Sequence, residues 1–385
     1  MATKKKNVKD EAVQDGLQAL LNLPTMVKIV KEHGGQILQP GNMVNDYVKN
    51  RAPTGIFPFD YGTGGGFPIG RLSILYGPFG GAKTSTALRA MGMMQKKCSN
   101  CWNWIMHPIT GEVFDCGCGE FRETICAWQN VEQSLDLDWS ERMGLDMSRV
   151  AYSQPDYGEQ AIDVTEALLE SGKCHMVLLD SLAYLVPSKE IEISTEKGIM
   201  GNQPFLVARA IKKWLAAMGR CDAEHGFKPT MICTNQIRYK MTMFGDPETM
   251  SGGVSPGFMA NMIVRVQSGK AKTEKGEELL GSNFQEMNFK VTKQKSGGPH
   301  REGSYYLVTK DDKEHNRSKG DVIDEHIVEE FAKKFNVLYQ EGKKWMCLER
   351  EFRVIADWKE EMWKDRLYAW NVKQHLLQVM TAEEG

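Results

Sequence analysis

The chain has 385 residues, 48 of them basic and 50 acidic, and its formal net charge is −2. This balance excludes a protein that is basic over its whole surface, so any binding to nucleic acid needs a local patch. The length exceeds that of a usual single compact domain, and 41% apolar residues suffice for one large core with smaller attachments.

No segment approaches the roughly 20 apolar residues of a membrane span. The lysines near the N-terminus are not followed by the apolar core of a secretory signal. We therefore expect a cytoplasmic protein with no membrane contact. Four of the nine cysteines lie within 98–118, and in a reducing compartment such clustering favours a metal site over disulfides.

Strands are predicted to alternate with helices through most of the chain. Residues 1–45 read as an arm with a helical stretch around 16–23. Apolar runs then predict buried strands at 71–77, 124–132, 176–181, 230–236, 262–268 and 287–295. Helical spacing predicts helices at 84–97, 159–172, 205–220 and 326–338, a hairpin at 344–355 and a final helix. This alternation predicts an α/β fold with a largely parallel sheet covered by helices.

The segment GPFGGAKT, residues 77–84, joins the first of these strands to a helix. Such a loop exposes backbone N–H groups at a helix N-terminus, where phosphates bind. Lys83 can reach the terminal phosphates and the Thr84 hydroxyl can ligate Mg²⁺. The usual pattern has glycine where Ala82 stands, and alanine disfavours a positive φ. We therefore expect the loop to be preserved if Ala82 adopts ordinary helical dihedrals. The alternative is a chance glycine-rich turn.

Two carboxylates follow predicted strands. Asp180 stands at the carboxyl end of 176–181, where parallel sheets bind ligands and where a carboxylate can orient the water of Mg²⁺; otherwise it caps the following segment. Glu132 stands just past 124–132 and can activate a water toward the γ-phosphate of ATP, although a glutamate in such a place is often merely solvated.

Several segments resemble motifs of the bacterial RecA recombinase family, in family order. The segment 53–71 is similar to the one that leads into the family's phosphate loop. The others are SQPDYGEQA (153–161), LLDS (178–181), TNQIR (234–238), MFGDPET with SGG (243–253) and KVTKQK (290–295). The resemblance implies a RecA-type ATPase core at 46–312, an arm at 1–45 that packs on a neighbouring subunit, and a small α+β domain at 313–385.

The resemblance also implies an ATPase that polymerises on single-stranded DNA and exchanges strands with a homologous duplex. By position, Glu132 matches the catalytic glutamate, Asp180 the Mg²⁺-linked aspartate, and Gln236 the γ-phosphate sensor. Lys293 and Lys295 match lysines that reach the ATP of the neighbouring subunit, as an arginine finger does. The nucleotide-binding residues implied are Gly77, Pro78, Phe79, Gly80, Gly81, Ala82, Lys83, Thr84 and Ser85, with Asp136 and Trp139 at the adenine.

Two DNA-facing loops follow from the same match, at 187–205 and 238–257, and their contacts would be independent of sequence. The residues implied are Met200, Gly201, Lys212, Arg238, Lys240, Gly252 and Gly253. Taken without the resemblance, the second loop reads as ordinary surface. The partners that the resemblance implies are single- and double-stranded DNA, and further copies of the protein in a helical filament. Single-strand-binding or mediator proteins are further candidates. The protein would be DNA-associated in the nucleoid, or in the host cytoplasm if it is viral.

A four-cysteine insertion at 96–122 replaces a short turn of the family pattern. Cys98 and Cys101 form C-x-x-C, and Cys116 and Cys118 form C-x-C. Four thiolates on two turns suit a closed, structural Zn²⁺ site, with free thiols or disulfides as the alternative. His107 can replace one cysteine, but we expect it to be exposed in a hairpin. Trp102 and Trp104 either pack beneath the metal or stack on DNA or a partner.

The insertion and the divergence from the family pattern favour a bacteriophage member. Two other functions stay open: a ring-forming helicase or branch-migration motor on the same fold, and a DNA-coating filament protein that uses ATP as a switch, with hydrolysis weakened by Ala82. The motifs at 234–238 and 243–249 favour the recombinase over the motor.

Overall fold

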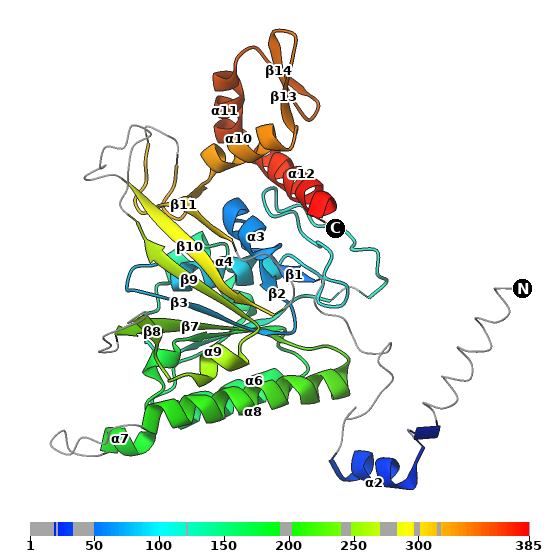
Figure 1. Cartoon of the computed structure of the whole chain (residues 1–385), viewed down its shortest axis with the longest axis vertical. Coiled ribbons are helices and arrows are strands. Elements are labelled where there is room, and N and C mark those ends of the chain that lie inside the picture. Colours follow the sequence, from blue (N-terminus) through cyan, green and yellow to red (C-terminus); the bar gives the residue numbers. More distant parts are fainter. Residues whose placement is uncertain are drawn as a thin grey trace, which may run out of the picture.

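The computed structural model describes residues 19–20, 22–33, 50–120, 122–192, 202–239, 248–269, 283–295, 301–313 and 317–384. Its centre is a ten-stranded sheet in the order β12-β11-β10-β9-β3-β7-β6-β4-β5, with β8 paired to β7 (Figure 1). The strands are β3 (Leu72–Gly77), β4 (Cys126–Asn130), β5 (Val150–Ser153), β6 (Met176–Asp180), β7 (Thr230–Tyr239), β8 (Glu248–Met250), β9 (Met262–Ser268), β10 (Phe284–Gln294), β11 (Glu302–Val308) and β12 (Val322–Ile323).

The sheet is parallel from β5 through β9 and antiparallel from β9 through β12. All six strands predicted from apolar runs are present, as β3, β4, β6, β7, β9 and β10. The strands of this sheet that the sequence did not predict are β5, β8, β11 and β12. Both β5 and β8 are only partly buried, so neither carries a continuous apolar run.

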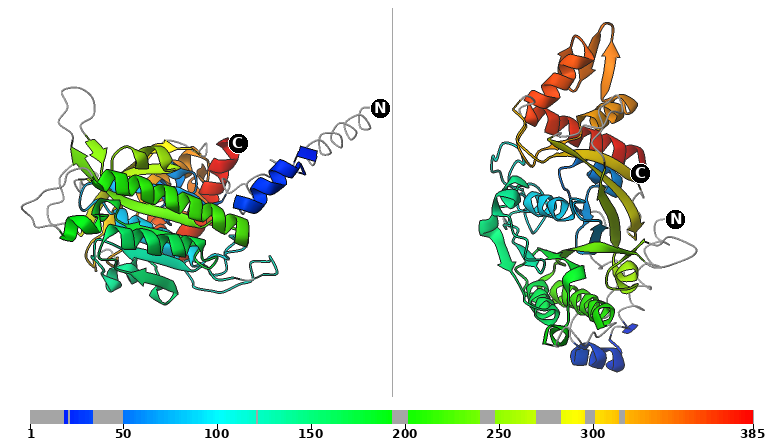
Figure 2. Two further views of the ribbon diagram at one scale, coloured as in Figure 1. Left: turned by 90° about the horizontal axis from the view of Figure 1, so that it is seen from below. Right: turned by 90° about the vertical axis from the view of Figure 1, so that its left-hand side faces the viewer.

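Helices cover both faces of this sheet. On one face lie α6 (Gly158–Glu170) and α8 (Asn202–His225), seen from below in Figure 2, and on the other lie α3 (Phe57–Thr63) and α4 (Lys83–Met94). Shorter helices are α5 (Leu137–Arg142), α7 (Ser188–Glu192) and α9 (Ser255–Met259). A small separate sheet pairs β1 (Arg51–Ala52) with β2 (Phe67–Pro68).

Side chains of β3 alternate between two hydrophobic cores, because successive residues of a strand face opposite sides of the sheet. Leu75 packs with Met91 of α4 and Trp128 of β4 in one core. Ile74 packs with Leu179 of β6 and the fully buried Trp214 of α8 in the other. The phosphate-loop segment therefore leaves a strand that is fixed on both faces.

A third core lies in the C-terminal part. It is built from α10 (Glu325–Lys334), α11 (Ile355–Lys364), α12 (Arg366–Glu384) and the sheet β13 (Leu338–Glu341), β14 (Lys344–Cys347) and β15 (Arg350–Phe352). Trp358 and Leu376 are fully buried there, and Phe57 of α3 joins them from the central part. The predicted helix at 326–338 and hairpin at 344–355 correspond to α10 and to β14 with β15.

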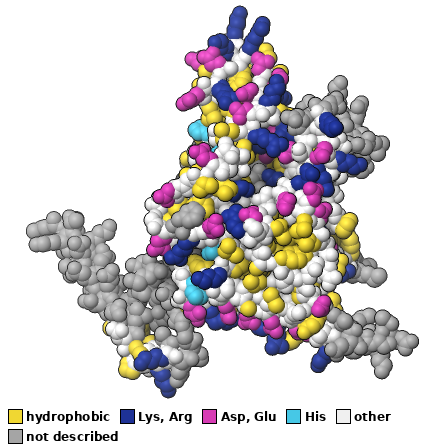
Figure 3. All heavy atoms as spheres, turned by 180° about the vertical axis from the view of Figure 1, so that it is seen from behind, with side chains coloured by type: hydrophobic (Ala, Val, Ile, Leu, Met, Phe, Trp, Pro, Cys, Tyr) yellow, Lys and Arg dark blue, Asp and Glu magenta, His cyan; other side chains and the backbone are white. Residues whose placement is uncertain are grey.

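The surface mixes both signs of charge. On the face shown in Figure 3, Lys and Arg side chains are interspersed with Asp and Glu, which agrees with the nearly balanced composition. Among the described helices, none is both long and apolar enough to cross a membrane. Of the predicted arm, the structure describes residues 19–20 and 22–33, which include α2 (Pro24–His33).

Candidate functional site

The phosphate-loop segment runs from the end of β3 to the start of α4. Gly77 is required there by close packing, because a Cβ at this position would lie 1.8 Å from the carbonyl oxygen of Val266 in β9. The Lys83 ammonium is folded back onto the loop and donates to the carbonyl oxygens of Pro78 (2.8 Å) and Gly77 (3.3 Å). Both acceptors are uncharged, so the charged oxygens of a phosphate can replace them as partners of the ammonium.

Ala82 differs from the expectation of helical dihedrals. It precedes α4 with φ 57° and ψ 26°, in the left-handed region that favours glycine. Gly80, at φ 73°, is also left-handed. The alanine is therefore held in a strained conformation by the strand and the helix that fix the two ends of the loop.

The carboxyl ends of four neighbouring strands bring polar side chains together. In the parallel register, Gln236 of β7 pairs with Gly77, and Asp180 of β6 pairs with Asn130 of β4. The Thr84 hydroxyl donates to Asp180 Oδ2 at 2.7 Å, and the Thr234 hydroxyl of β7 donates to Asp180 Oδ1. Hydroxyl and carboxylate oxygens are the donor set that Mg²⁺ prefers, so Thr84 and Asp180 fit that ion.

Glu132 lies two residues past the end of β4, beside Asp180. Its backbone N–H donates to the Asp180 carbonyl oxygen at 3.0 Å. Burial and the neighbouring Asp180 carboxylate raise the pKa of Glu132, against the opposing effect of Lys83. Burial also raises the pKa of Asp180 and lowers that of Lys83. Three ionisable groups, one cation and two carboxylates, thus act on one another in one partly buried site.

A cavity of about 440 Å³ opens beside these groups. On one side it is lined by the loop from Phe79 to Ser85, and on another by Glu132 and Trp139. The Trp139 indole N–H donates to the Ser85 hydroxyl at 3.0 Å. Asp136 also lines the cavity, and its carboxylate caps α5 by accepting a hydrogen bond from the backbone N–H of Trp139. The flat Trp139 ring therefore lines the same cavity as the loop that can bind phosphates.

The residues that sequence reasoning missed include Thr234, which holds the Asp180 carboxylate, and Lys319, which lines the cavity. Thr234 sits within a buried strand and reads there as core. Lys319 places its ammonium 5.3 Å from the centre of the Trp139 ring. It comes from the segment predicted to be a separate C-terminal domain, and no motif distinguishes it from other surface lysines.

Gln236 is connected to the predicted DNA loop through a short chain of hydrogen bonds. Its carbonyl oxygen accepts from Ser251 N–H at 3.1 Å, and its neighbour Asn235 donates to the Ser251 carbonyl oxygen at 2.9 Å. Arg238 Nε donates to the Ser251 hydroxyl at 3.0 Å. Directly after Ser251 come Gly252 and Gly253, both at positive φ. A Cβ on Gly252 would lie 2.8 Å from Val207 of α8.

Lys293 and Lys295 lie together at the end of β10. Both ammonium groups donate to the Phe258 carbonyl oxygen, at 2.9 Å and 2.8 Å, and Lys293 also donates to Gly257. Neither lysine lines the cavity of its own chain. Phe258 beside them is 74% exposed, so this end of the sheet presents two cations and an aromatic ring to solvent.

The structure describes only some of the residues that we predict to contact DNA. Lys212 lies exposed on α8, and Arg238 is exposed near the end of β7. Met200, Gly201 and Lys240 lie outside the described residues.

The four clustered cysteines converge. The sulfur atoms of Cys98, Cys101, Cys116 and Cys118 all lie within 4.8 Å of one another. The Cys98–Cys118 separation is 3.8 Å and the Cys116–Cys118 separation is 3.3 Å. Four thiol sulfurs in one compact group fit tetrahedral Zn²⁺, with every ligand position taken by protein. By contrast, Cys126 is fully buried in β4 and lies outside this group.

The aromatic side chains of the insertion have partners within the chain. Trp102 is 8% exposed and packs edge to face on His175, just before β6. Trp104 packs edge to face on Trp370 of α12, and the Lys97 ammonium lies 4.3 Å from the centre of its ring. His107 was expected to be exposed, but it is partly buried because its ring also meets Trp370. The insertion therefore bridges the central part and the last helix.

Fold and site together define an α/β protein with a phosphate loop at the carboxyl edge of a largely parallel sheet. A family model described as the RecA N-terminal domain matches residues 118–312, just over half of the chain. The chain belongs to the RecA family, and its core is of the RecA type. The matched region begins inside the cysteine insertion, so it includes Glu132, Asp180 and Gln236 but not the phosphate loop.

Relatives named Protein RecA agree with this assignment. The one from Thermotoga neapolitana is 32% identical over 258 residues, 66% of this chain and 64% of the relative. The one from Petrotoga mobilis is 28% identical over 307 residues, 79% of this chain and 73% of the relative. The one from Symbiobacterium thermophilum is 32% identical over 287 residues, with 74% and 72% covered. The chain thus spans just under two thirds of the first of these relatives.

Proposed function

We propose that the protein is an ATP-dependent recombinase that polymerises on single-stranded DNA and pairs it with a homologous duplex. The observation that carries this proposal is the junction between two sites. Gln236 of β7 pairs with Gly77, the first residue of the phosphate loop, at the end of β3. Its carbonyl oxygen accepts from Ser251, which directly precedes the two glycines of the predicted DNA loop. A nucleotide held at the loop would therefore act, through Gln236 and Ser251, on the segment that we predict to contact DNA.

The nucleotide would lie in the cavity beside Trp139, with its adenine on the indole ring and its phosphates along the loop. Lys83 would exchange its carbonyl contacts for phosphate oxygens, which are stronger acceptors because they are charged. Thr84 and Asp180 would hold Mg²⁺, which neutralises phosphate charge when it is bound. A zinc ion held by the four cysteines would be structural.

Glu132 would orient and deprotonate the attacking water. Its raised pKa matches this role, because a base is most effective when its pKa approaches the working pH. Lys293 and Lys295 would neutralise transition-state charge in the cavity of the adjacent protomer. The support is their absence from their own chain's cavity and their position beside the exposed Phe258.

The test is ATP hydrolysis with and without single-stranded DNA, together with electron microscopy of the same samples. Single-stranded DNA should stimulate hydrolysis, and helical filaments should appear with a non-hydrolysable ATP analogue. Glu132→Gln should lower hydrolysis by about 10²-fold or more and preserve filaments. Unstimulated hydrolysis together with closed rings would contradict the proposal.

The strained Ala82 favours one alternative, a filament protein that uses ATP as a switch and hydrolyses it slowly. The left-handed alanine places a methyl group where the usual loop has none. Hydrolysis by Ala82→Gly distinguishes the two functions. A large increase in turnover, with filament assembly unchanged, would favour the switch.

A further inference from the structure

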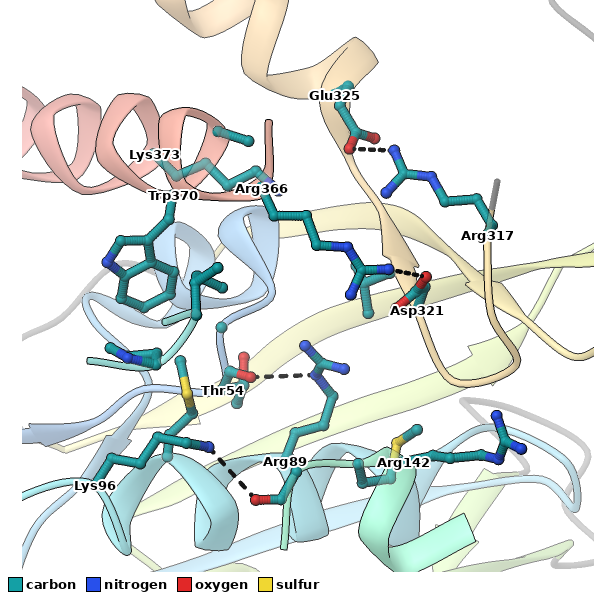
Figure 4. Close-up of a pocket in the computed structure, with 18 of the residues that line it drawn as sticks. Thr54, Arg89, Lys96, Arg142, Arg317, Asp321, Glu325, Arg366, Trp370 and Lys373 are labelled. Atoms are coloured by element: carbon teal, nitrogen blue, oxygen red, sulfur yellow. Dashed lines mark hydrogen bonds and ion pairs between the residues drawn. The ribbon is translucent and has the colours of Figure 1, made fainter. Parts of the chain in front are cut away.

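A second cavity, of about 330 Å³, lies where several parts of the chain meet (Figure 4). The helix α4 supplies Arg89 and Lys96, the cysteine insertion supplies Pro108 and Ile109, and α12 supplies Trp370 among other residues. It shares no lining residue with the cavity beside Trp139. The insertion forms one of its walls, so the cavity depends on the segment that interrupts the RecA-type core.

The lining is strongly cationic. Six basic side chains face two carboxylates, which are Asp321 and Glu325. Four of the six cations have acidic partners. The pairs are Arg317 with Glu325 at 2.9 Å, Arg366 with Asp321 at 2.7 Å, Arg142 with Asp138 at 2.8 Å, and Lys373 with Asp324.

Arg89 and Lys96 are bonded only to carbonyl oxygens, among the contacts of the described residues. Arg89 donates to Thr54 and Gly320, both at 3.3 Å, and Lys96 donates to Gly92 and Gly144 at 3.3 and 3.5 Å. These distances are at the long end of the hydrogen-bonding range. The two cations therefore lack the short, charged partners that such groups usually acquire when they are buried.

The surrounding charges act differently on the two groups. Burial lowers the pKa of both groups, and the Arg89 charge lowers that of Lys96 further, as does Arg149. Tyr305, Asp324, Asp321 and Asp60 oppose the effect at Arg89.

In addition, Arg317 is only 7% exposed, and its Nε has no hydrogen-bond partner. A buried donor in this position is costly unless it meets an acceptor. Arg317 is held by Glu325. An anion in the cavity would therefore offer acceptors first to Arg89 and Lys96, and to Arg366 across the cavity from Arg89 (Figure 4).

One wall of the cavity is apolar and aromatic. Met93, Met143 and Trp370 line it, and Trp370 is fixed by its edge-to-face contact with Trp104 at 5.9 Å between ring centres. Figure 4 shows Arg89 and Arg366 reaching the cavity from opposite sides, with Trp370 at its edge. A ligand that combines negative charge with a planar ring matches both halves of this lining.

We propose that this cavity binds a small phosphorylated molecule of mononucleotide size, with its phosphate between Arg89, Lys96 and Arg366 and its ring beside Trp370. The volume lies at the lower end of small-molecule pockets and excludes a duplex. Arg89 lies six residues beyond Lys83 on the same helix, so occupancy of this site acts on the helix that carries the phosphate loop.

The test is isothermal titration calorimetry on Lys83→Ala protein, in which the phosphate loop is disabled. The probes are 5′-AMP and inorganic pyrophosphate. We expect one AMP per chain, bound more tightly than pyrophosphate because of the ring contact. Adding Arg89→Gln or Lys96→Gln should weaken AMP binding about tenfold or more, as expected for loss of one charge-assisted hydrogen bond. The control Lys343→Gln, at an exposed hairpin lysine, should leave it unchanged.

Further variants and one competitor distinguish a loss of ligand contacts from a loss of folding, and a small ligand from DNA. Arg89→Lys and Lys96→Arg keep the charge and should keep most of the affinity, whereas a folding defect would show in circular dichroism of the Gln variants. Saturating duplex DNA should leave AMP bound. The proposal is overturned if Lys83→Ala protein binds no AMP, if pyrophosphate binds as tightly as AMP, if the Gln variants bind normally, or if the duplex displaces AMP.

Discussion

Ala82→Gly tests the strained phosphate loop most directly. A left-handed conformation costs a residue with a Cβ about 1–2 kcal/mol. Glycine removes that strain but costs about 0.5–1 kcal/mol in chain entropy on folding. It also loses a partly buried methyl group, worth about 0.4 kcal/mol if half of the usual contribution applies. The net change in stability is therefore small, and a matched control is needed to reveal the strain.

Ala216 supplies that control, because it is exposed in the middle of α8. Ala216→Gly incurs the entropy cost with no strain to relieve, so it should destabilise the protein by about 0.5–1 kcal/mol. Ala82→Gly should be more stable than Ala216→Gly by about 1 kcal/mol. The assay is urea unfolding of both variants in the absence of nucleotide. Equal midpoints, or a lower midpoint for Ala82→Gly, would refute the reasoning.

Four further outcomes are expected. Glu132→Gln should lower ATP turnover by about 10²-fold or more while nucleotide still binds, as measured by steady-state hydrolysis and fluorescent-nucleotide titration; near-normal turnover would remove Glu132 from the proposed chemistry. Because the pKa of Glu132 is raised above 4.5 and the base must be ionised, kcat/KM should fall on acidification at a higher pH than for an ordinary glutamate, and an acid limb at or below 4.5 would contradict this. Metal analysis should find one zinc per chain, lost in Cys116→Ser/Cys118→Ser and retained in Cys347→Ser, whose thiol is buried in the C-terminal core; equal zinc in both variants would place the metal elsewhere. Trp370→Ala should expose the insertion to limited proteolysis because it removes the contact with Trp104, whereas Leu367→Ala on the same helix should not, and equal cleavage of the two would deny the bridge.

The central strands and the phosphate loop could be predicted from the sequence because buried parallel strands carry continuous apolar runs. Their order along the sheet edge then brings Thr84, Asp180 and Glu132 together. The dihedral angles of Ala82 could not be predicted, since they depend on how the flanking strand and helix constrain the loop. The edge strand β5 escaped prediction because only part of its surface is buried.

Contacts between distant segments were the main features beyond sequence reasoning. Lys319 reaches Trp139 across 180 residues of chain, and Trp104 reaches Trp370 across 266. No local pattern encodes either pair, because each depends on where the C-terminal part packs. The cationic cavity arises in the same way, from side chains of α4, the insertion and α12 that are separated in sequence.

The central claim is that two protomers complete one ATP site. Lys83→Ala and Lys293→Gln/Lys295→Gln proteins should each hydrolyse ATP poorly on single-stranded DNA. Mixed in equal amounts, they should recover about a quarter of the wild-type rate, since random pairing brings the intact halves together at about one junction in four. A mixture no more active than its separate components would contradict the shared site.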